Sequence, residues 1–177
     1  LIIEAMRRMQ RDRAVYLGDP AFVSMPVKML TDPDYAAGLR TSIRLDRATP
    51  SAALASAPEA HVGGGNTTHF SILDKDGNRV AGTITLNAGF GSGLMVDGTG
   101  MLLNNQMDDF SIKPGVPNIY GLIGASANAI APGKRMLSSI TPTFVEGPRG
   151  YMIVGSPGGS LITGMVLLAT LDWMDGK

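Results

Sequence analysis

The feature that most constrains the fold is an aperiodic stretch in the first half of the chain, residues 47–66, with the sequence RATPSAALASAPEAHVGGGN. Alanine, serine, proline and glycine dominate it, and neither a helical nor a strand period runs through it. This composition is typical of a flexible, solvent-exposed linker. Because the hydrophobic pattern is helical before this stretch and alternates after it, the stretch predicts a boundary inside the 177-residue chain.

Two segments before the linker are predicted to be helical. Residues 1–16 place Ile2, Met6 and Met9 at helical spacing, so that Glu4, Arg7, Arg8, Arg11 and Arg13 can face solvent. Residues 32–43 are predicted to form a second helix, with proline in its first turn. Since the chain begins inside a helical pattern without an initiator methionine or a cap, we expect it to be a piece of a longer polypeptide.

The pattern after the linker favours antiparallel strands. Residues 69–74 and 79–87 alternate, and Asp76-Gly77 between them is typical of a two-residue hairpin turn. A second hairpin is predicted from residues 142–146 and 151–155, and an apolar helix over residues 161–174 follows it. Hairpins combined with helices predict a layered α+β domain.

The composition excludes several classes of function. Hydrophobic residues make up 44% and charged residues 17%, which is enough for a buried core. A net charge of zero argues against a general nucleic-acid binder, and the absence of cysteine excludes disulfides, thiolate nucleophiles and cysteine-based zinc sites. No apolar run is long enough to span a bilayer. The two histidines, His61 and His69, lack metal-ligand spacing to any partner.

Thr67 is a candidate nucleophile. A threonine hydroxyl attacks weakly until a base removes its proton, and a threonine at a chain terminus can use its own α-amine as that base. Thr67 follows the Gly63–Gly65 tract and precedes a strand, so self-cleavage there could release a terminus without breaking a sheet. On spacing alone, however, an ordinary strand threonine explains the position better.

Each of the other candidate polar groups can have either a structural role or a role in a functional site. Thr85 lies close to Thr67 if the hairpin pairs, but it can equally be a solvent-facing strand residue. The cluster at residues 104–109, NNQMDD, is either a capped turn or a binding site. Ser138-Ser139 can cap an element or bind a carboxylate. Gly158-Gly159, just before a helix, is either a tight turn or an oxyanion site.

Taken together, these segments resemble the γ-glutamyltranspeptidases. Six blocks in order carry the resemblance and cover nearly the whole chain: IEAMRRMQRDRAVYLGDPAFV, TTHFSILDKDGN, TLNAGFGSG, LLNNQMDDFSIKPGVPNIYGLIG, KRMLSSITPT and GSPGGS. The resemblance implies the αββα sandwich of N-terminal-nucleophile hydrolases, of which this chain would form part. It also implies a precursor that cuts itself between Asn66 and Thr67. Residues 1–66 would then end the large subunit, and residues 67–177 would begin the small, catalytic one.

The resemblance further implies a role for each site residue. Thr67 would be the nucleophile, Thr85 would hydrogen-bond around it, and the amides of Gly158 and Gly159 would form the oxyanion hole. The residues that would hold the γ-glutamyl group are Asn87, Gln106 and Asp109 at its amino end and Ser138 and Ser139 at its carboxylate. Residues 113–124 would form a lid, with Tyr120 as a gate that contacts Asn87.

The implied reaction moves a γ-glutamyl group from glutathione or a similar compound, through an ester on Thr67, to water or to an amino acid or dipeptide acceptor. It implies no cofactor, no metal and no nucleic-acid partner, and it requires the remainder of the large subunit. Bacterial members are periplasmic or secreted, which we expect here. One alternative is an acylase for glutaryl-type β-lactam side chains, whose substrate would leave Asp109 unpaired. Another is an unprocessed, non-catalytic fragment.

Overall fold

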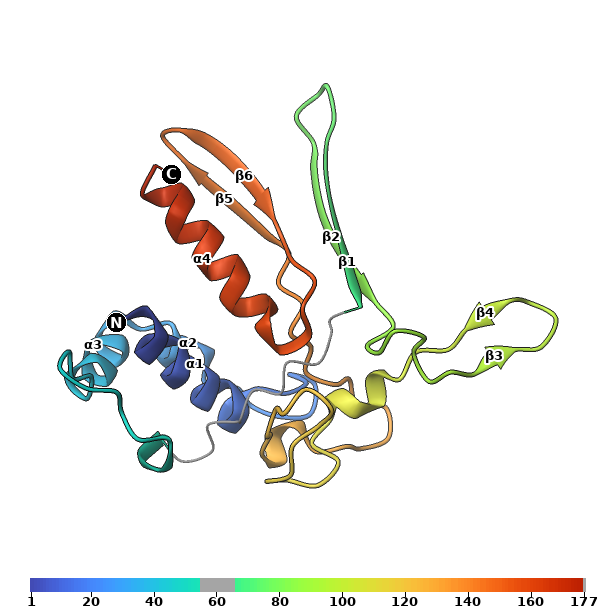
Figure 1. Ribbon diagram of the computed structural model, residues 1–177, viewed down its shortest axis with the longest axis horizontal. Helices are drawn as coiled ribbons and strands as arrows, with labels where there is room; N and C mark the ends of the chain where they lie inside the picture. The colour runs from blue at the N-terminus through green and yellow to red at the C-terminus, as the bar shows by residue number, and fades with distance from the viewer. Residues whose placement is uncertain (55–65, 177) are drawn as a thin grey trace. The chain divides into compact units, whose positions relative to one another are not determined.

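The computed structural model describes residues 1–54 and 66–176, which group into two compact units (Figure 1). Unit 1 contains Leu1–His61 and Met107–Leu137, and unit 2 contains Val62–Gln106 and Ser138–Lys177. Helices and antiparallel hairpins occur together, as the α+β prediction requires. The predictions for the linker glycines and for His61 lie outside the described residues.

The helices of unit 1 follow the sequence pattern. They are α1 (Ile2–Tyr16), α2 (Val27–Leu30) and α3 (Pro33–Thr41). The carboxylate of Asp32 caps α3 by accepting a hydrogen bond from the Asp34 amide at 2.7 Å, and proline occupies the first turn. Helix α2 was not predicted, because four residues are too few to show a hydrophobic period.

The buried face of α1 is polar, so the expectation that its charged residues face solvent was wrong for part of the helix. Glu4, Arg8 and Asp12 are buried, whereas the apolar Ile2 and Ile3 are exposed. The Glu4 carboxylate accepts hydrogen bonds from the Arg8 guanidinium at 2.7 Å and from the Thr49 hydroxyl at 2.6 Å. Because these partners satisfy the buried charges, the polar row can lie inside.

A second buried carboxylate, that of Asp19, connects the end of α1 to the segment around Arg135. Asp19 follows α1 and accepts three hydrogen bonds from Arg135, one from its amide and two from its guanidinium, at 2.8–3.1 Å. These bonds hold the pKa of the Asp19 carboxyl well below its usual range. The Lys134 ammonium donates to the carbonyls of Ala127 and Ala129 on either side of the end of η3 (Ser126–Asn128). Side chains thus fix an irregular backbone to the end of α1.

Unit 2 contains two long hairpins. Strands β1 (Thr67–Leu73) and β2 (Arg79–Thr85) pair antiparallel over their full length, from Thr67 opposite Thr85 to Leu73 opposite Arg79. The loop between them is residues 74–78, longer than the predicted two-residue turn. The Asp74 carboxylate causes the difference, because it accepts hydrogen bonds from the amides of Asp76 and Asn78 and closes the wider loop.

The second predicted hairpin is confirmed, but its turn is tighter than the four residues between the predicted strands, because Gly147 pairs with Gly150. Strands β5 (Thr143–Gly147) and β6 (Gly150–Val154) pair antiparallel across two turn residues. The 3₁₀ turn η4 (Gly159–Leu161) leads into α4 (Ile162–Met174), which confirms the predicted apolar helix. The two hairpins contact each other through the Arg79 guanidinium, which lies 3.7 Å from the centre of the Tyr151 ring.

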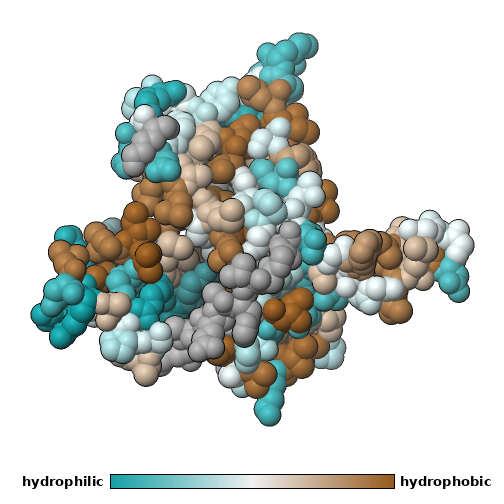
Figure 2. Space-filling view, viewed as in Figure 1, coloured by the Kyte–Doolittle hydropathy of each residue, from teal (hydrophilic) through white to brown (hydrophobic). Residues whose placement is uncertain are grey.

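A third, short hairpin was not predicted. Strands β3 (Met95–Val96) and β4 (Met101–Leu102) form a narrow arm of unit 2 whose hydrophobic residues are visible at its surface (Figures 1 and 2). Leu94, Met95 and Met101 are all more than half exposed. Two-residue strands carry too little alternation to be recognised in the sequence.

Candidate active site

Thr67, the predicted nucleophile, is the first residue of β1 and faces Thr85 across the hairpin. Its hydroxyl donates a hydrogen bond to the Thr85 hydroxyl at 3.3 Å. The Thr85 hydroxyl also accepts a hydrogen bond from the Asn87 amide at 2.9 Å. The proximity of Thr85 to Thr67 is therefore confirmed, and two hydrogen bonds orient the Thr85 hydroxyl.

Asn87, just beyond β2, has an unusual backbone. It is buried and has a φ of 75°, a left-handed value that is uncommon outside glycine and often marks a functional site. Its side-chain amide donates to the carbonyl of Asn105 at 3.3 Å, and the Asn105 side chain accepts from the Ala88 amide at 2.9 Å. No role was predicted for Asn105 itself, although it lies in the NNQMDD cluster.

Gln106 follows Asn105 directly and begins the 3₁₀ turn η2 (Gln106–Asp109). The Asn105 amide donates to the carbonyl of Leu86 at 3.2 Å, so this turn starts from a backbone tied to the end of β2. Gln106 is thus the chain neighbour of Asn105, whose carbonyl accepts a hydrogen bond from the Asn87 side chain. The proposed substrate contact of Gln106 stays a prediction.

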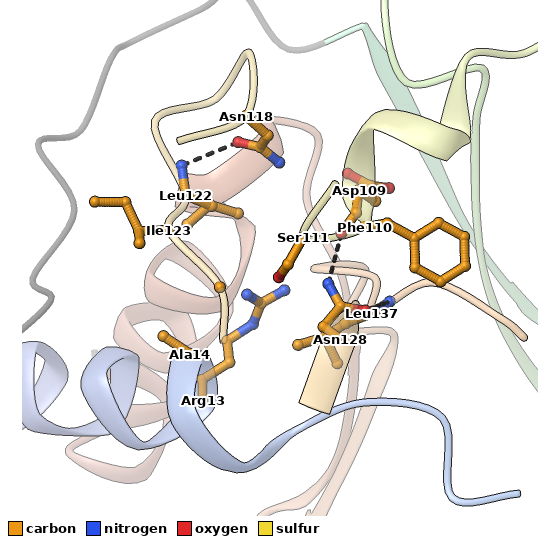
Figure 3. Close-up of a pocket in the computed structure, with 11 residues that line it drawn as sticks. Arg13, Ala14, Asp109, Phe110, Ser111, Asn118, Leu122, Ile123, Asn128 and Leu137 are labelled. Carbon is orange, nitrogen blue, oxygen red and sulfur yellow. Dashed lines mark hydrogen bonds between the residues drawn. The ribbon is translucent and has the colours of Figure 1, made fainter. Parts of the chain in front are cut away.

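Asp109 belongs to unit 1, is half-buried and lies among charged side chains. Burial and the neighbouring Asp108 carboxylate raise its pKa to about 6, and the Arg13 guanidinium opposes that rise. Arg13 comes from α1, and burial lowers its own pKa. Both residues line a cavity of about 20 Å³, where the Arg13 guanidinium is directed toward Ser111 (Figure 3). Arg13 was expected to face solvent, and no local sequence signal links it to Asp109.

The predicted lid, residues 113–124, folds on side-chain hydrogen bonds. The Asn118 side chain accepts from the amides of Tyr120 and Leu122 at 3.0 and 2.9 Å. The Asp108 carboxylate accepts from the Ile119 amide at 3.1 Å. Tyr120 is buried, and burial together with the nearby Asp109 raises the pKa of its hydroxyl. The predicted contact between Tyr120 and Asn87 stays a prediction.

The remaining predicted residues lie in unit 2. The Ser138 hydroxyl accepts from the Ile140 amide at 3.1 Å, and the Ser139 carbonyl accepts from the Thr141 hydroxyl at 2.9 Å. Gly158 and Gly159 both have positive φ, 130° and 56°, at the start of η4. A side chain at either position would be strained, so glycine is required for this turn. Their role in an oxyanion hole stays a prediction.

With this geometry in hand, comparison with known proteins identifies the family. The family model for gamma-glutamyltranspeptidase matches residues 1–176. The chain belongs to the γ-glutamyltranspeptidase family. It is 52% identical over 174 residues to a glutathione hydrolase proenzyme of a Pseudomonas species, covering 98% of this chain and 30% of that protein. It is 47% identical over 176 residues to the glutathione hydrolase proenzyme of Escherichia coli, with 99% and 30% covered.

The solved structures include members of the same family. A mutant of the Helicobacter pylori γ-glutamyltranspeptidase aligns with a TM-score of 0.59 at 53% identity, covering 61% of this chain and 59% of that chain. The γ-glutamyltranspeptidase segment described here thus spans about 30% of the length of the curated relatives it matches. The resemblance seen in the sequence is confirmed at the level of the family.

Metal-binding clusters and membrane-spanning helices are both absent from the part of this γ-glutamyltranspeptidase segment that the structure describes. Within residues 1–54 and 66–176, no three histidine or carboxylate side chains gather closely enough to hold a metal ion. Within the same residues, every helix is too short or too polar to cross a membrane.

Proposed function

We propose that the complete polypeptide carrying this segment is a γ-glutamyl acyltransferase that matures by cutting itself between Asn66 and Thr67. The observation that carries the proposal is the hydrogen bond between the hydroxyls of Thr67 and Thr85, in a chain that belongs to the γ-glutamyltranspeptidase family. Thr67 is the first residue of β1, directly after the proposed cleavage site. A new terminus at this point presents its hydroxyl and its α-amine together.

Cleavage acts as a switch in this mechanism. In the precursor the nitrogen of Thr67 is an amide and cannot accept a proton. After cleavage it is an amine, which takes the proton of the Thr67 hydroxyl as that oxygen attacks the γ-amide carbonyl of the substrate. The amides of Gly158 and Gly159 stabilise the negative oxygen that develops. The amine product leaves with the proton, and water or an acceptor amine then removes the γ-glutamyl group from Thr67.

Charge selects the substrate. A γ-glutamyl group carries an α-ammonium, which Asp109 pairs with while Asn87 and Gln106 donate or accept hydrogen bonds beside it. Ser138 and Ser139 hold the α-carboxylate. A glutaryl amide lacks the ammonium and would leave the carboxylate of Asp109 buried without that partner, at a cost in binding. The charge of Asp109 would therefore favour γ-glutamyl compounds, such as glutathione, over glutaryl amides.

The remainder of the polypeptide completes the enzyme. We propose that it supplies the rest of the large and small subunits and, with the hairpins and helices described here, completes an αββα sandwich. Tyr120 and residues 113–124 close over the bound substrate. We propose that the enzyme lies in the periplasm or outside the cell, which rests on the resemblance to bacterial members of the family alone.

The test uses the complete polypeptide and the variant Thr67→Ala, with Thr68→Ala as the matched control. We expect wild type and the Thr68→Ala variant to run as two fragments on a denaturing gel and to release p-nitroaniline from γ-glutamyl-p-nitroanilide. The Thr67→Ala variant should remain one chain without activity. A Thr67→Ala protein that still separates into two fragments would exclude the proposed cleavage. Faster turnover of glutaryl-p-nitroanilide by wild type would instead favour the acylase alternative.

A further inference from the structure

We infer that Asn105 is a positioning residue for the reaction of Thr67, because it locks the backbone that holds the Thr85 hydroxyl in place. The inference rests on the proposed function, which makes the Thr67 hydroxyl the nucleophile both for self-cleavage and for the substrate. In this role Asn105 need not touch the substrate. It acts through Asn87, and all four residues belong to unit 2.

Asn105 binds three consecutive residues just after β2. Its amide donates to the carbonyl of Leu86 at 3.2 Å, and its carbonyl accepts from the side-chain amide of Asn87 at 3.3 Å. Its side-chain oxygen accepts from the amide of Ala88 at 2.9 Å. A single residue thus holds the peptide groups on both sides of Asn87 as well as the Asn87 side chain.

Those two peptide groups define the backbone conformation of Asn87. The carbonyl of Leu86 belongs to the planar peptide before Asn87, and the amide of Ala88 belongs to the one after it, so the φ and ψ of Asn87 are the rotations that relate them. The φ of Asn87 is 75°, a value that a residue with a side chain keeps only where its surroundings fix it. Holding both peptides to one partner supplies that restraint.

The same backbone conformation directs the amide of Asn87 at Thr85. This amide donates to the Thr85 hydroxyl at 2.9 Å, and the Thr85 hydroxyl accepts from the Thr67 hydroxyl at 3.3 Å. The Asn87 amide and the Leu86 carbonyl are the two ends of one peptide group, whose other end binds Asn105. If Asn87 left its left-handed conformation, this peptide would rotate, and the Thr85 hydroxyl would lose the donor that orients it toward Thr67.

The segment that carries Asn105 is also tied to the loop after β2 at positions a few residues removed. The amide and the hydroxyl of Ser92 both donate to the carbonyl of Leu103, at 2.9 and 3.1 Å. The amide of Leu103 donates to the carbonyl of Leu94 at 2.9 Å. Ser92 is therefore a matched control position, because its hydroxyl joins the same two segments away from the peptide groups of Asn87.

The contact with Ala88 requires only an acceptor from the side chain of Asn105. Because the partner is an N–H group, the side-chain oxygen and not its nitrogen must face it. Aspartate keeps an oxygen at this position. Alanine removes it and leaves the two backbone hydrogen bonds of Asn105 in place, and the hydroxyl of serine is one bond too short to replace it.

The experiment follows self-cleavage of the complete polypeptide, made by cell-free translation and sampled over time on a denaturing gel. Self-cleavage needs no added substrate, so its rate reports on the Thr67 hydroxyl apart from any substrate contact of Asn87. We expect Asn105→Ala to slow the cleavage about tenfold, as for the loss of one well-placed hydrogen bond. Asn105→Asp should cleave within about threefold of the wild-type rate, and Ser92→Ala at the wild-type rate.

A double variant tests the route through Thr85. Thr85→Val removes the hydroxyl that Asn105 holds in place and keeps the shape of the side chain. Adding Asn105→Ala to Thr85→Val should slow cleavage by less than about twofold more, because the group through which Asn105 acts is already missing. A further loss of about tenfold would show that Asn105 acts by another route, and the inference would be overturned.

The outcomes distinguish this inference from the proposed function. If the wild-type polypeptide does not cut itself, the proposed function is wrong. If it does, and Asn105→Ala cleaves at the same rate, or Asn105→Asp fails to restore the rate, or Ser92→Ala slows cleavage equally, the inference is overturned while the proposed function stands. Asn105→Ser takes the place of Asn105→Ala if that protein does not fold, and should slow cleavage in the same way.

Discussion

Unit 1 buries charged and amide side chains, whereas unit 2 pairs strands and leaves much of their apolar surface exposed. In unit 1 the buried Glu4, Asp19 and Asn128 each accept or donate several hydrogen bonds to segments far along the chain. In unit 2 the hairpins are held by backbone ladders, and Ile72, Ile84 and Phe144 are more than half exposed.

This difference corresponds to a division of tasks in the proposed enzyme. The nucleophile stands on a strand ladder, whose geometry depends little on the identity of side chains. The residue proposed to recognise charge, Asp109, stands on irregular backbone that only specific side chains hold in place. Mutations in unit 1 should therefore change selectivity and pH dependence, whereas the chemistry of Thr67 should depend on the hairpin.

The largest expected effect follows replacement of Asp109, which separates recognition from cleavage. The Asp109→Asn variant should lower kcat/KM for γ-glutamyl-p-nitroanilide by a factor of about 10²–10³, because an ammonium then enters a buried site without its counter-charge. Self-cleavage between Asn66 and Thr67, followed on a denaturing gel, should proceed as in wild type. Equal loss of both functions would contradict the division between the units.

The next effect concerns the polar interior of unit 1. Arg8→Ala should lower the melting temperature at neutral pH, because the buried Glu4 carboxylate loses one of its two ion pairs and keeps only the one with Arg7. Glu4 has its pKa lowered to about 2 by Thr49, Arg8 and Arg7, so its stabilising contribution is present above its usual 4.5 and is lost as pH falls toward 2. The difference in melting temperature between wild type and the variant should therefore shrink across that range.

A variant in unit 2 serves as the control for the pH dependence expected of Arg8→Ala. Gly77→Ala places a side chain at a φ of 86° in the β1–β2 loop and should cost about 1 kcal/mol, with no change in this cost between neutral and acidic pH. A difference for Arg8→Ala that does not depend on pH would show that the charges of α1 contribute nothing beyond packing.

The smallest expected effect is a shift in the pH profile. Asp109 must be ionised to bind an ammonium, and its pKa is about 6, so kcat/KM for the γ-glutamyl anilide should fall as pH drops below about 6. Asp108, Arg13 and Tyr120 are the charged or titratable groups around it. Arg13 opposes the rise in the pKa of Asp109, so Arg13→Gln should move the midpoint upward.

The matched control for that shift is Arg11→Gln, which removes a guanidinium of the same helix that pairs with Asp12 instead. Its profile should keep the wild-type midpoint. The raised pKa also means that the folded protein binds this proton more tightly than the unfolded chain, so Asp109 costs stability as pH rises from its usual 3.8 to about 6. If Arg13→Gln left the midpoint of the pH profile unchanged, the Arg13 guanidinium would not influence the pKa of Asp109.

The strands and helices were predictable because their signals are local. Alternation around a turn predicted both long hairpins, and helical spacing predicted α1, α3 and α4. The five-residue loop was missed because the Asp74 carboxylate, rather than the Asp76-Gly77 pair alone, shapes it. An aspartate four residues before an asparagine, as in Asp74 and Asn78, is a local sequence signal for a loop closed by a side chain.

The buried polar contacts were not predictable in the same way. Arg13 and Asp109 lie far apart in the sequence, and only the folded chain shows that they share a cavity. Periodicity likewise shows that Glu4 and Arg8 share a face of α1, but it does not reveal the partners at Ser42 and Thr49 that make burial of that face acceptable. The site residues themselves came from the family resemblance, and their roles stay predictions until they are measured.

The position of Thr67 at the very start of β1 has a consequence for the energetics of maturation. All seven cross-strand pairs of the hairpin lie on the C-terminal side of the bond before it. Hydrolysis of that bond would break none of them, so the ladder is equally long in the precursor and in the mature protein. The pairing of the strands would then neither oppose nor drive the cut. Maturation at this bond would not require the hairpin to be rebuilt.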